Sequence, residues 1–265
     1  MFMSGILLAT IIVGATGCLI GLFLTFAAKK FYVEVDEREE AILEALPGNN
    51  CGGCGYAGCA SLAHAIATGE APVSQCPVGG EVVAERIASI MGVESSSQER
   101  KVAFVRCNGS CETAKEVYNY SGSSDCSAVS ELPNSGPKAC NYGCLGRGSC
   151  EKVCDFNAIH VIDGVAKVNR ENCVACGKCV NICPQHIIDL IPYDSPTEVG
   201  CSSKEPGKVV MKVCASGCIA CHLCEKNCPN GAIKVIDNVA VIDHDKCNGC
   251  KICVEKCPKK VILEF

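Results

Sequence analysis

Eight cysteines in the middle of the chain recur 74 residues later, so the chain holds two copies of one sulfur-bearing module. The two copies differ in ligand chemistry at one position, where the first has Arg147 and the second has Cys221. The first copy comprises Cys140, Cys144, Cys150, Cys154, Cys173, Cys176, Cys179 and Cys183. The second comprises Cys214, Cys218, Cys224, Cys228, Cys247, Cys250, Cys253 and Cys257.

The second copy contains two runs of the form Cys-x2-Cys-x2-Cys-x3-Cys-Pro, which end at Pro229 and Pro258. This spacing is typical of bacterial two-cluster ferredoxins, in which the fourth Cys of each run ligates the other cluster. The predicted cofactors are 4Fe–4S clusters, and the predicted chemistry is one-electron transfer. The crossover rule gives one ligand set of Cys218, Cys221, Cys224 and Cys257, and another of Cys247, Cys250, Cys253 and Cys228.

The first copy predicts one regular ligand set and one irregular set. Cys173, Cys176, Cys179 and Cys154 form the regular set. The other set keeps Cys144, Cys150 and Cys183 but lacks the ligand that Arg147 replaces, and Cys140 is the nearest candidate. A further set precedes both modules, where Cys51-x2-Cys54-x4-Cys59 is followed by Cys76, and glycines surround the first three of these cysteines. These assignments give five clusters.

Five cysteines are then unassigned: Cys107, Cys111, Cys126, Cys201 and Cys214. We predict a sixth cluster from among them. Unligated thiols or a zinc site are the alternatives. A second assignment groups Cys107, Cys111, Cys126 and Cys140, and leaves the Arg147 set incomplete. Cys18 lies in an apolar segment and is excluded from the clusters.

Other uses of the cysteines fit the sequence less well. A disulfide scaffold is expected in short secreted chains, and zinc sites usually show two separated Cys-x2-Cys pairs. Four thiolates at Cys51–Cys76 would also suit zinc. None of the five histidines lies at a ligand position in these runs. The chain shows no fingerprint for NAD or flavin binding, no catalytic triad and no sign of nucleic-acid binding.

Residues 5–28 form an uncharged run of 24 residues. A helix of this length spans about 36 Å, enough for a hydrocarbon core of about 30 Å. Lys29 and Lys30 follow, and the positive-inside rule then places the remaining chain in the cytoplasm. The sequence thus predicts a single-pass protein of the cell (inner) membrane. Gly17-x3-Gly21 would permit close approach of a second helix, although a plain lipid-facing anchor is the alternative.

The predicted fold class is α+β: a transmembrane helix, a small helical Fe–S domain and two tandem ferredoxin-like modules. The domains are residues 1–30 (anchor), 31–95 (N-terminal cluster domain), 96–135 (Cys-containing connection), 136–200 (first module) and 201–265 (second module). Helices are expected over residues 33–46, 60–68 and 80–91, and hairpins turn at Asp163-Gly164 and Asp237-Asn238. Residues 92–103, 120–138 and 192–209 are expected to be loops.

Charge is uneven along the chain. Residues 31–134 hold 15 acidic and 6 basic side chains, whereas residues 201–265 hold 10 lysines and 7 acids. Five lysines lie near the last cysteines, at Lys246, Lys251, Lys256, Lys259 and Lys260. One interpretation is that these lysines only form part of the solvated surface. The other is that these lysines attract an acidic partner and raise the encounter rate.

The order of these elements resembles the B subunits of Rnf complexes, the ion-translocating ferredoxin:NAD oxidoreductases. The resemblance rests on the apolar N-terminal segment, on Cys51-Gly-Gly-Cys54-Gly-Tyr-Ala-Gly-Cys59 with Cys76-Pro77, and on the two ferredoxin runs. It covers essentially the whole chain. Cys140-Asn-Tyr-Gly-Cys144 and Gly217-Cys218-Ile-Ala-Cys221 are similar to the longer, cluster-rich form.

The resemblance implies an electron-relay subunit. Reduced ferredoxin would deliver electrons to it, and sibling subunits would reduce NAD and move sodium or protons. The second module would then dock ferredoxin, and the Cys51–Cys76 set would pass electrons to the membrane partners. Two other functions fit the sequence: a membrane-tethered electron donor without ion pumping, and a non-redox metal-binding scaffold.

Overall fold

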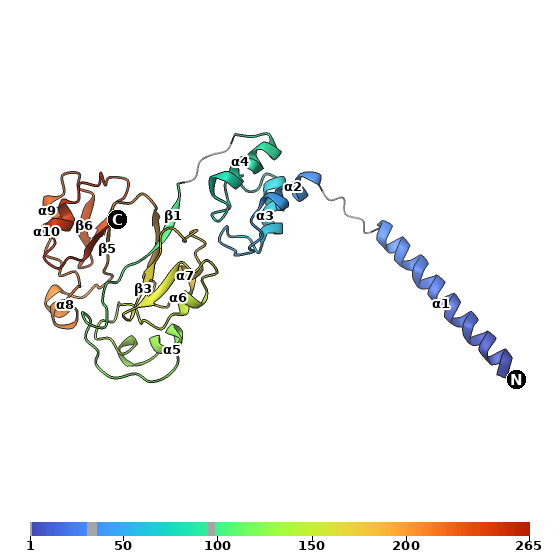
Figure 1. The fold of residues 1–265 in the computed structure, drawn as a ribbon, viewed down its shortest axis with the longest axis horizontal. Coiled ribbons are helices and arrows are strands. Elements are labelled where there is room, and N and C mark those ends of the chain that lie inside the picture. The colour runs from blue at the N-terminus through green and yellow to red at the C-terminus, as the bar shows by residue number, and fades with distance from the viewer. Residues whose placement is uncertain (1, 31–35, 95–98) are drawn as a thin grey trace.

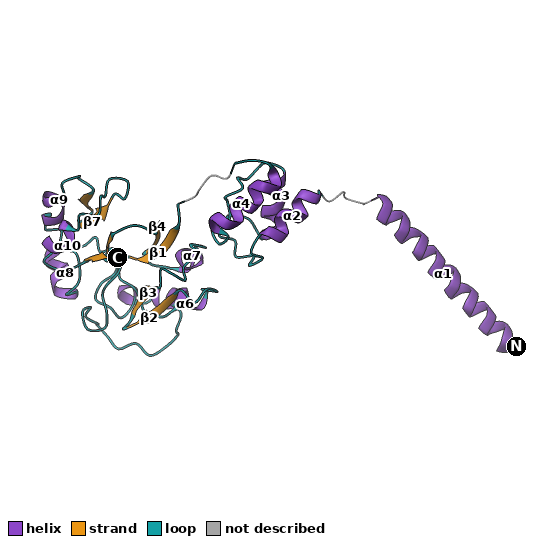
Figure 2. Ribbon diagram, turned by 45° about the horizontal axis from the view of Figure 1, so that its top comes forward, coloured by secondary structure: helices purple, strands orange, loops and turns teal. Residues whose placement is uncertain are grey.

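The computed structural model describes residues 2–30, 36–94 and 99–265, and within these ranges the side chains of residues 2–11 and 28 are left out. Short helices, four two-stranded antiparallel sheets and many loops follow one another along the chain (Figures 1 and 2). The mixture of helices and strands agrees with the predicted α+β class. Two-stranded sheets bury little apolar surface by themselves, so other interactions must hold these units together.

The helix α1 (Phe2–Lys30) covers the segment for which the sequence predicts a membrane span. Its described apolar side chains are exposed, as Leu22 and Phe23 illustrate. Within the ranges that the structure describes, no helix meets the length and apolarity needed to cross a membrane, so the predicted span is not found.

Three helices form the N-terminal cluster domain: α2 (Glu37–Ala45), α3 (Cys59–Ala67) and α4 (Gly80–Met91). Their core is made by Ile42, Leu62, Ile66 and Ile87, each almost fully buried. The three predicted helices are therefore confirmed, although residues 33–35 of the first lie outside the described part.

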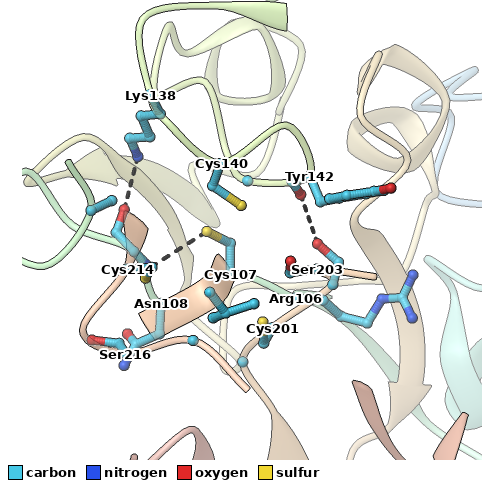
Figure 3. A pocket seen from close by; sticks show the side chains of 17 residues that line it. Arg106, Cys107, Asn108, Lys138, Cys140, Tyr142, Cys201, Ser203, Cys214 and Ser216 are labelled. Atoms are coloured by element: carbon cyan, nitrogen blue, oxygen red, sulfur yellow. Dashed lines mark hydrogen bonds between the residues drawn. The ribbon is translucent and has the colours of Figure 1, made fainter. Parts of the chain in front are cut away.

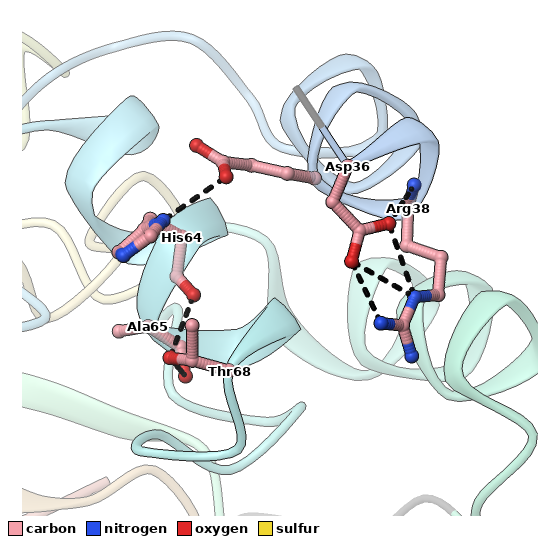
Figure 4. A network of polar contacts seen from close by, with 6 residues as sticks. Asp36, Arg38, His64, Ala65 and Thr68 are labelled. Atoms are coloured by element: carbon pink, nitrogen blue, oxygen red, sulfur yellow. Dashed lines mark hydrogen bonds and ion pairs between the residues drawn. The ribbon is translucent and has the colours of Figure 1, made fainter. Parts of the chain in front are cut away.

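Polar contacts at the surface of this domain connect α2 and α3 (Figure 4). The Asp36 carboxylate caps α2 by accepting from the Arg38 amide and pairs with the Arg38 guanidinium at 2.7 Å. Glu39 on α2 pairs with His64 on α3 at 3.0 Å. The hydrogen bond to Glu39 raises the pKa of His64.

The first module contains two two-stranded sheets, of which one is a hairpin, and three short helices. The strand β1 (Lys101–Val105) pairs with β4 (Ile188–Pro192), and β2 (Ile159–Ile162) pairs with β3 (Val165–Val168). The helices α6 (Ser149–Lys152) and α7 (Lys178–Ile182) carry cysteines of the repeat, and α5 (Cys126–Ser130) precedes the 3₁₀ turn η1 (Pro133–Ser135). Val102, Ile159 and Val165 lie at the centre of the apolar core.

The second module repeats this plan. The strand β5 (Thr197–Val199) pairs with β8 (Ile262–Glu264), and β6 (Ile233–Ile236) pairs with β7 (Val239–Ile242). The helices α9 (Leu223–Asn227) and α10 (Ile252–Lys256) correspond to α6 and α7, and α8 (Gly207–Val213) links the two modules. Val199, Ile233 and Val261 are buried in its core.

Both predicted hairpins are confirmed. The turn residues Asp163 and Gly164 have φ of 50° and 74°, and Asp237 and Asn238 have φ of 47° and 64°. Positive φ at both central residues gives a turn whose twist matches that of the flanking strands, and Asn, Asp and Gly adopt it most readily.

Three predicted loops contain regular structure instead. Residues 101–105 form β1, residues 126–130 form α5, and residues 197–199 form β5. The two strands are made by pairing with β4 and β8, which lie far along the chain, so the local sequence carries little sign of them. The connecting segment thereby becomes part of the first module, and β5 becomes part of the second.

The strand β6 offers a matched pair of substitutions. Ile233 is 2% exposed and Ile236 is 53% exposed. Ile233→Ala should cost about 2–5 kcal/mol because it leaves a cavity, and Ile236→Ala should change stability by less than about 0.5 kcal/mol. The urea midpoint for loss of cluster absorption in anaerobic protein measures the difference, and equal midpoints for the two variants would contradict the assigned register.

Candidate metal centres

The cysteines of the two modules surround five cavities, each lined by four sulfur-bearing side chains. Three of these sets combine residues as the crossover rule predicts. They are the first-module outer site (Cys154, Cys173, Cys176 and Cys179), the second-module inner site (Cys218, Cys221, Cys224 and Cys257) and the second-module outer site (Cys228, Cys247, Cys250 and Cys253).

Short helices position these cysteines, and each helix follows a residue in the left-handed region. Gly177 (φ 77°) precedes α7, His222 (φ 59°) precedes α9, and Lys251 (φ 58°) precedes α10. The reversal of the chain at these residues turns Cys179, Cys224 and Cys253 back towards the cysteines that precede them. Only two residues lie between each of these cysteines and the one before it, and a residue in the left-handed region allows such a tight return.

The fourth cavity, the first-module inner site, is lined by Cys126, Cys144, Cys150 and Cys183. The structure thus brings Cys126, rather than Cys140, to the set that Arg147 leaves short of a ligand. Cys126 begins α5, and its amide donates to the Ser149 hydroxyl at 2.8 Å. That hydroxyl donates to Asp125, the residue that caps α5, at 2.9 Å. These bonds fix the first turn of α5 against the start of α6.

Arg147 is not among the residues that line the first-module inner cavity. Its guanidinium lies over the Tyr120 ring, 4.9 Å from the ring centroid. Tyr120 packs against the small apolar cluster of Cys126, Val129 and Leu145. The arginine therefore takes part in packing the segment that carries Cys126.

The fifth cavity, the bridging site, lies between the modules and is lined by Cys107, Cys140, Cys201 and Cys214 (Figure 3). Cys107 follows β1, Cys201 follows β5, and Cys214 follows α8. Burial raises the pKa of Cys140, and the neighbouring Cys107 and Cys214 act in the same direction. Three stretches of the chain, at Cys107, at Cys140 and at Cys201 with Cys214, thus meet here, and no local motif marks the set.

Two hydrogen bonds connect the bridging site to its neighbours. The amide of Cys144, from the first-module inner site, donates to the Cys107 sulfur at 3.3 Å. The amide of Cys218, from the second-module inner site, donates to the Cys201 sulfur at 3.3 Å. The bridging site is therefore in direct contact with one site of each module.

The sequence groups Cys51, Cys54, Cys59 and Cys76 as the N-terminal site. The last three pack against the core of α2 and α3. Asn50 holds the loop by accepting from the Cys59 amide at 2.8 Å, and Gln75 donates to the Cys54 carbonyl at 3.0 Å.

This loop lies against the first module. A Cβ added at Gly53 would lie 2.8 Å from the carbonyl oxygen of Cys176. Cys51 is close enough to Cys176 to contribute to its raised pKa, which burial raises first. The N-terminal site and the first-module outer site are thus neighbours.

Two cysteines lie apart from these sets, whereas His222 lines the second-module inner cavity. Cys111 is exposed beside Gly164, and Cys18 is exposed on α1. Four histidines pair with glutamates, at His64, His160, His222 and His244. Across the described residues, no three His, Cys, Asp or Glu side chains converge closely enough to hold a single metal ion.

The donor sets fit iron–sulfur clusters. Each set supplies four thiols, the usual ligands of a 4Fe–4S cluster. Backbone amides also donate to sulfurs at equivalent places of the repeat: Ala158 to Cys154, and Ala232 to Cys228, both at 3.3 Å. Such hydrogen bonds stabilise negative charge on the sulfur and belong to the factors that set cluster potentials.

Burial disfavours the ionised form of these thiols. It raises the pKa of Cys150 to about 12, with the neighbouring Cys144 and Cys126 acting in the same direction. It raises the pKa of Cys179 to about 12 and that of Cys201 to about 11. Thiolates gathered in such cavities need a positive partner, which bound iron provides.

Two family models match parts of the chain. The model described as "Putative Fe-S cluster" matches residues 46–78, and the model described as "4Fe-4S dicluster domain" matches residues 172–232 and 217–261. The matched segments contain the N-terminal site and most cysteines of the two modules.

Relatives match over nearly the whole chain. The B subunit of the Na(+)-translocating ferredoxin:NAD(+) oxidoreductase complex of Acetobacterium woodii is 46% identical, over 98% of this chain and 78% of its own length. The B subunit of the proton-translocating ferredoxin:NAD(+) oxidoreductase complex of Clostridium ljungdahlii is 39% identical, over 98% of this chain and 93% of its own. The B subunit of the ion-translocating oxidoreductase complex of Methanosarcina acetivorans is 40% identical, over 98% and 99%.

The chain belongs to the B subunits of the Rnf ion-translocating oxidoreductases. The resemblance seen in the sequence is confirmed. Within this Rnf protein, the 4Fe–4S domains support the predicted cofactor class.

The raised thiol pKa values predict a pH dependence of iron binding. In the metal-free protein, Cys150 and Cys201 stay protonated up to about pH 9 because burial raises the pKa of each. Iron binds the thiolate, so each ligand must lose a proton. Iron affinity should therefore increase from about pH 7 to about pH 9. Competition with a chelator, corrected for the chelator's own titration, measures it, and a pH-independent affinity would contradict the assignment.

Proposed function

We propose that this protein relays electrons through six 4Fe–4S clusters, from reduced ferredoxin to partner subunits of an ion-translocating ferredoxin:NAD oxidoreductase complex. When bound, each cluster accepts and donates one electron. The chain supplies the ligands, their order in space and the surface where a donor docks. The observation that carries the proposal is the bridging site, because it joins two modules that are otherwise separate electron carriers.

The proposed ligand sets are those of the six sites described above. They use every cysteine except Cys18 and Cys111. Cys140, Cys107, Cys201 and Cys214 would hold the sixth cluster, and Cys126 would complete the site that lacks a cysteine at Arg147. This assignment differs from the one expected from sequence proximity, in which Cys140 serves the Arg147 set.

The contacts between sites support a single linear order. The second-module outer and inner sites share one ferredoxin unit, the inner site contacts the bridging site through Cys218 and Cys201, and the bridging site contacts the first module through Cys107 and Cys144. The first-module outer site then faces the N-terminal site at Cys176 and Gly53. In this order, a single unbranched path passes through all six sites.

Exposure supports entry at the second module. Of the proposed ligands, only Cys221 and Cys250 are exposed, and both belong to this module. A soluble donor must come close to a ligand, so exposed ligands favour this end. Lys256 and Lys260 are exposed on the same module, and Lys251 is exposed in an ion pair with Glu264 at 3.5 Å. The lysines would attract an acidic ferredoxin.

Iron counting tests the ligand sets. Anaerobic protein should contain about 24 iron atoms, four for each cluster. Cys126→Ala and Cys140→Ala should each lose about four, because one missing ligand removes one cluster. The double variant should lose about eight if the two residues serve different clusters and about four if they share one.

Cys111→Ala is the matched control, since it removes a cysteine outside the six sites, and its iron content should equal that of the wild type. A double variant that loses no more iron than either single variant would refute the separation of Cys126 and Cys140. Zinc in place of iron would refute the electron-transfer function itself.

Docking is tested by charge reversal at Lys251, Lys256 and Lys260. The triple change to Glu should slow reduction by ferredoxin by roughly tenfold or more at low salt, because electrostatic steering falls with the attracting charge. It should also flatten the dependence of the rate on ionic strength. Stopped-flow absorbance measures both effects.

Reversal of Lys115 and Lys152 provides the control, since both are exposed but lie outside the second module. Their change to Glu should alter the rate much less. If both sets of substitutions slow reduction equally, the effect reports net charge rather than docking at the second module.

A further inference from the structure

Lys138 is a buried cation at the edge of the bridging site (Figure 3). It is only 4% exposed, which is rare for lysine. Its Nζ donates to the carbonyl oxygen of Gly109 at 2.8 Å and to that of Gly164 at 2.7 Å. Gly109 lies in the loop that follows Cys107, and Gly164 lies in the turn between β2 and β3. The ammonium group is therefore fixed between the bridging site and the first module.

No carboxylate offsets this charge. Among the ion pairs of the described residues none includes Lys138, whereas the nearby Arg106 pairs with Asp189 at 2.8 Å. Removing an ammonium group from water is costly unless opposite charge lies close by. Two carbonyl oxygens satisfy its hydrogen bonds but carry no net charge. The remaining source of negative charge is the set of thiolates that lines the cavity.

The Lys138 ammonium group lies close to the sulfurs of the bridging site. A Cβ added at Gly109, whose carbonyl accepts from Lys138, would lie 3.6 Å from the sulfurs of Cys107 and Cys214. Lys138 also binds the carbonyl of Gly164 in the first module, whereas Lys259 is only partly buried and lines the second-module inner cavity instead. Lys138 is thus the buried cation that faces the bridging site from within the protein.

We propose that Lys138 is a tuning residue, whose fixed positive charge raises the reduction potential of the bridging site. This inference rests on the proposed function, because it needs a cluster at Cys107, Cys140, Cys201 and Cys214. Net charge near a cluster is one of the factors that set its potential. A cation stabilises the reduced, more negative state and so makes the site easier to reduce. A higher reduction potential at the bridging site makes electron transfer onto it from the neighbouring module more favourable.

The test is an anaerobic redox titration followed by electron paramagnetic resonance on the full chain. The signal of the bridging site is first identified as the one absent from Cys201→Ala. Lys138→Met removes the charge at similar volume, and Lys138→Gln removes it but keeps a hydrogen-bond donor. Each should lower the equilibrium constant for reduction of that site by about tenfold or more, which corresponds to about 59 mV for one electron.

Two controls separate charge from packing. Lys138→Arg keeps the charge. Lys115→Gln removes a charge from an exposed residue whose carbonyl accepts from the amide of Ala139, next to Lys138. Both should leave the potential close to the wild-type value. The other five signals report whether a shift is confined to the bridging site and its neighbour.

The outcomes distinguish this inference from the function on which it rests. If Cys201→Ala loses no iron, the bridging site holds no cluster and both fail. If it loses its signal but neither neutral variant shifts the potential, the tuning role alone fails. An arginine variant that shifts as far as the neutral ones would show that geometry, not charge, is responsible. Loss of the site's iron in both neutral variants would assign Lys138 to assembly and also overturn the tuning role.

Discussion

The structure depends on placing many thiols inside small modules whose sheets and helices are short. Each module holds two two-stranded sheets and helices of four to seven residues, which are too small to be stable alone. Burial raises the pKa of thiols such as Cys150 and Cys179 to about 12, so the same cavities resist ionised sulfur until metal supplies positive charge. Folding and cofactor loading are then one process, since the free energy of metal binding becomes free energy of folding.

In the proposed relay, the bridging site joins two ferredoxin-like modules into one electron path. A duplicated module by itself would give two separate carriers. Cys107 and Cys201, from the loops after β1 and β5, instead meet Cys140 and Cys214, the first cysteine of each repeat, around a further cavity. The amides of Cys144 and Cys218 each donate to a sulfur of that cavity. Lys138 adds a fixed charge beside it. The two units are therefore joined where these two loops meet the first cysteines of the repeat.

Local sequence predicted the parts of the molecule that local interactions determine. The three helices of the N-terminal domain and both hairpins are confirmed, because caps and turn residues such as Gly69, Asp163 and Asn238 specify them. The strands β1 and β5 were missed, since each exists only through a partner distant in the chain. The ligand sets show the same contrast. Regular spacing was enough to group Cys173, Cys176 and Cys179. Spacing gives no sign that Cys126 lies beside Cys144, or Cys201 beside Cys107, because only the fold brings these pairs together. The helix predicted to span a membrane is present as α1, but no described helix meets the requirements of a span.

If the relay is linear, electrons reach the N-terminal site only through the bridging site. Rapid-freeze electron paramagnetic resonance after mixing with reduced ferredoxin tests this directly, with the wild type compared with Cys107→Ala. The variant should reduce its second-module sites as fast as the wild type does, while its first-module and N-terminal signals should be delayed by orders of magnitude. If all remaining sites of the variant are reduced at wild-type rates, the linear path through the bridging site is contradicted.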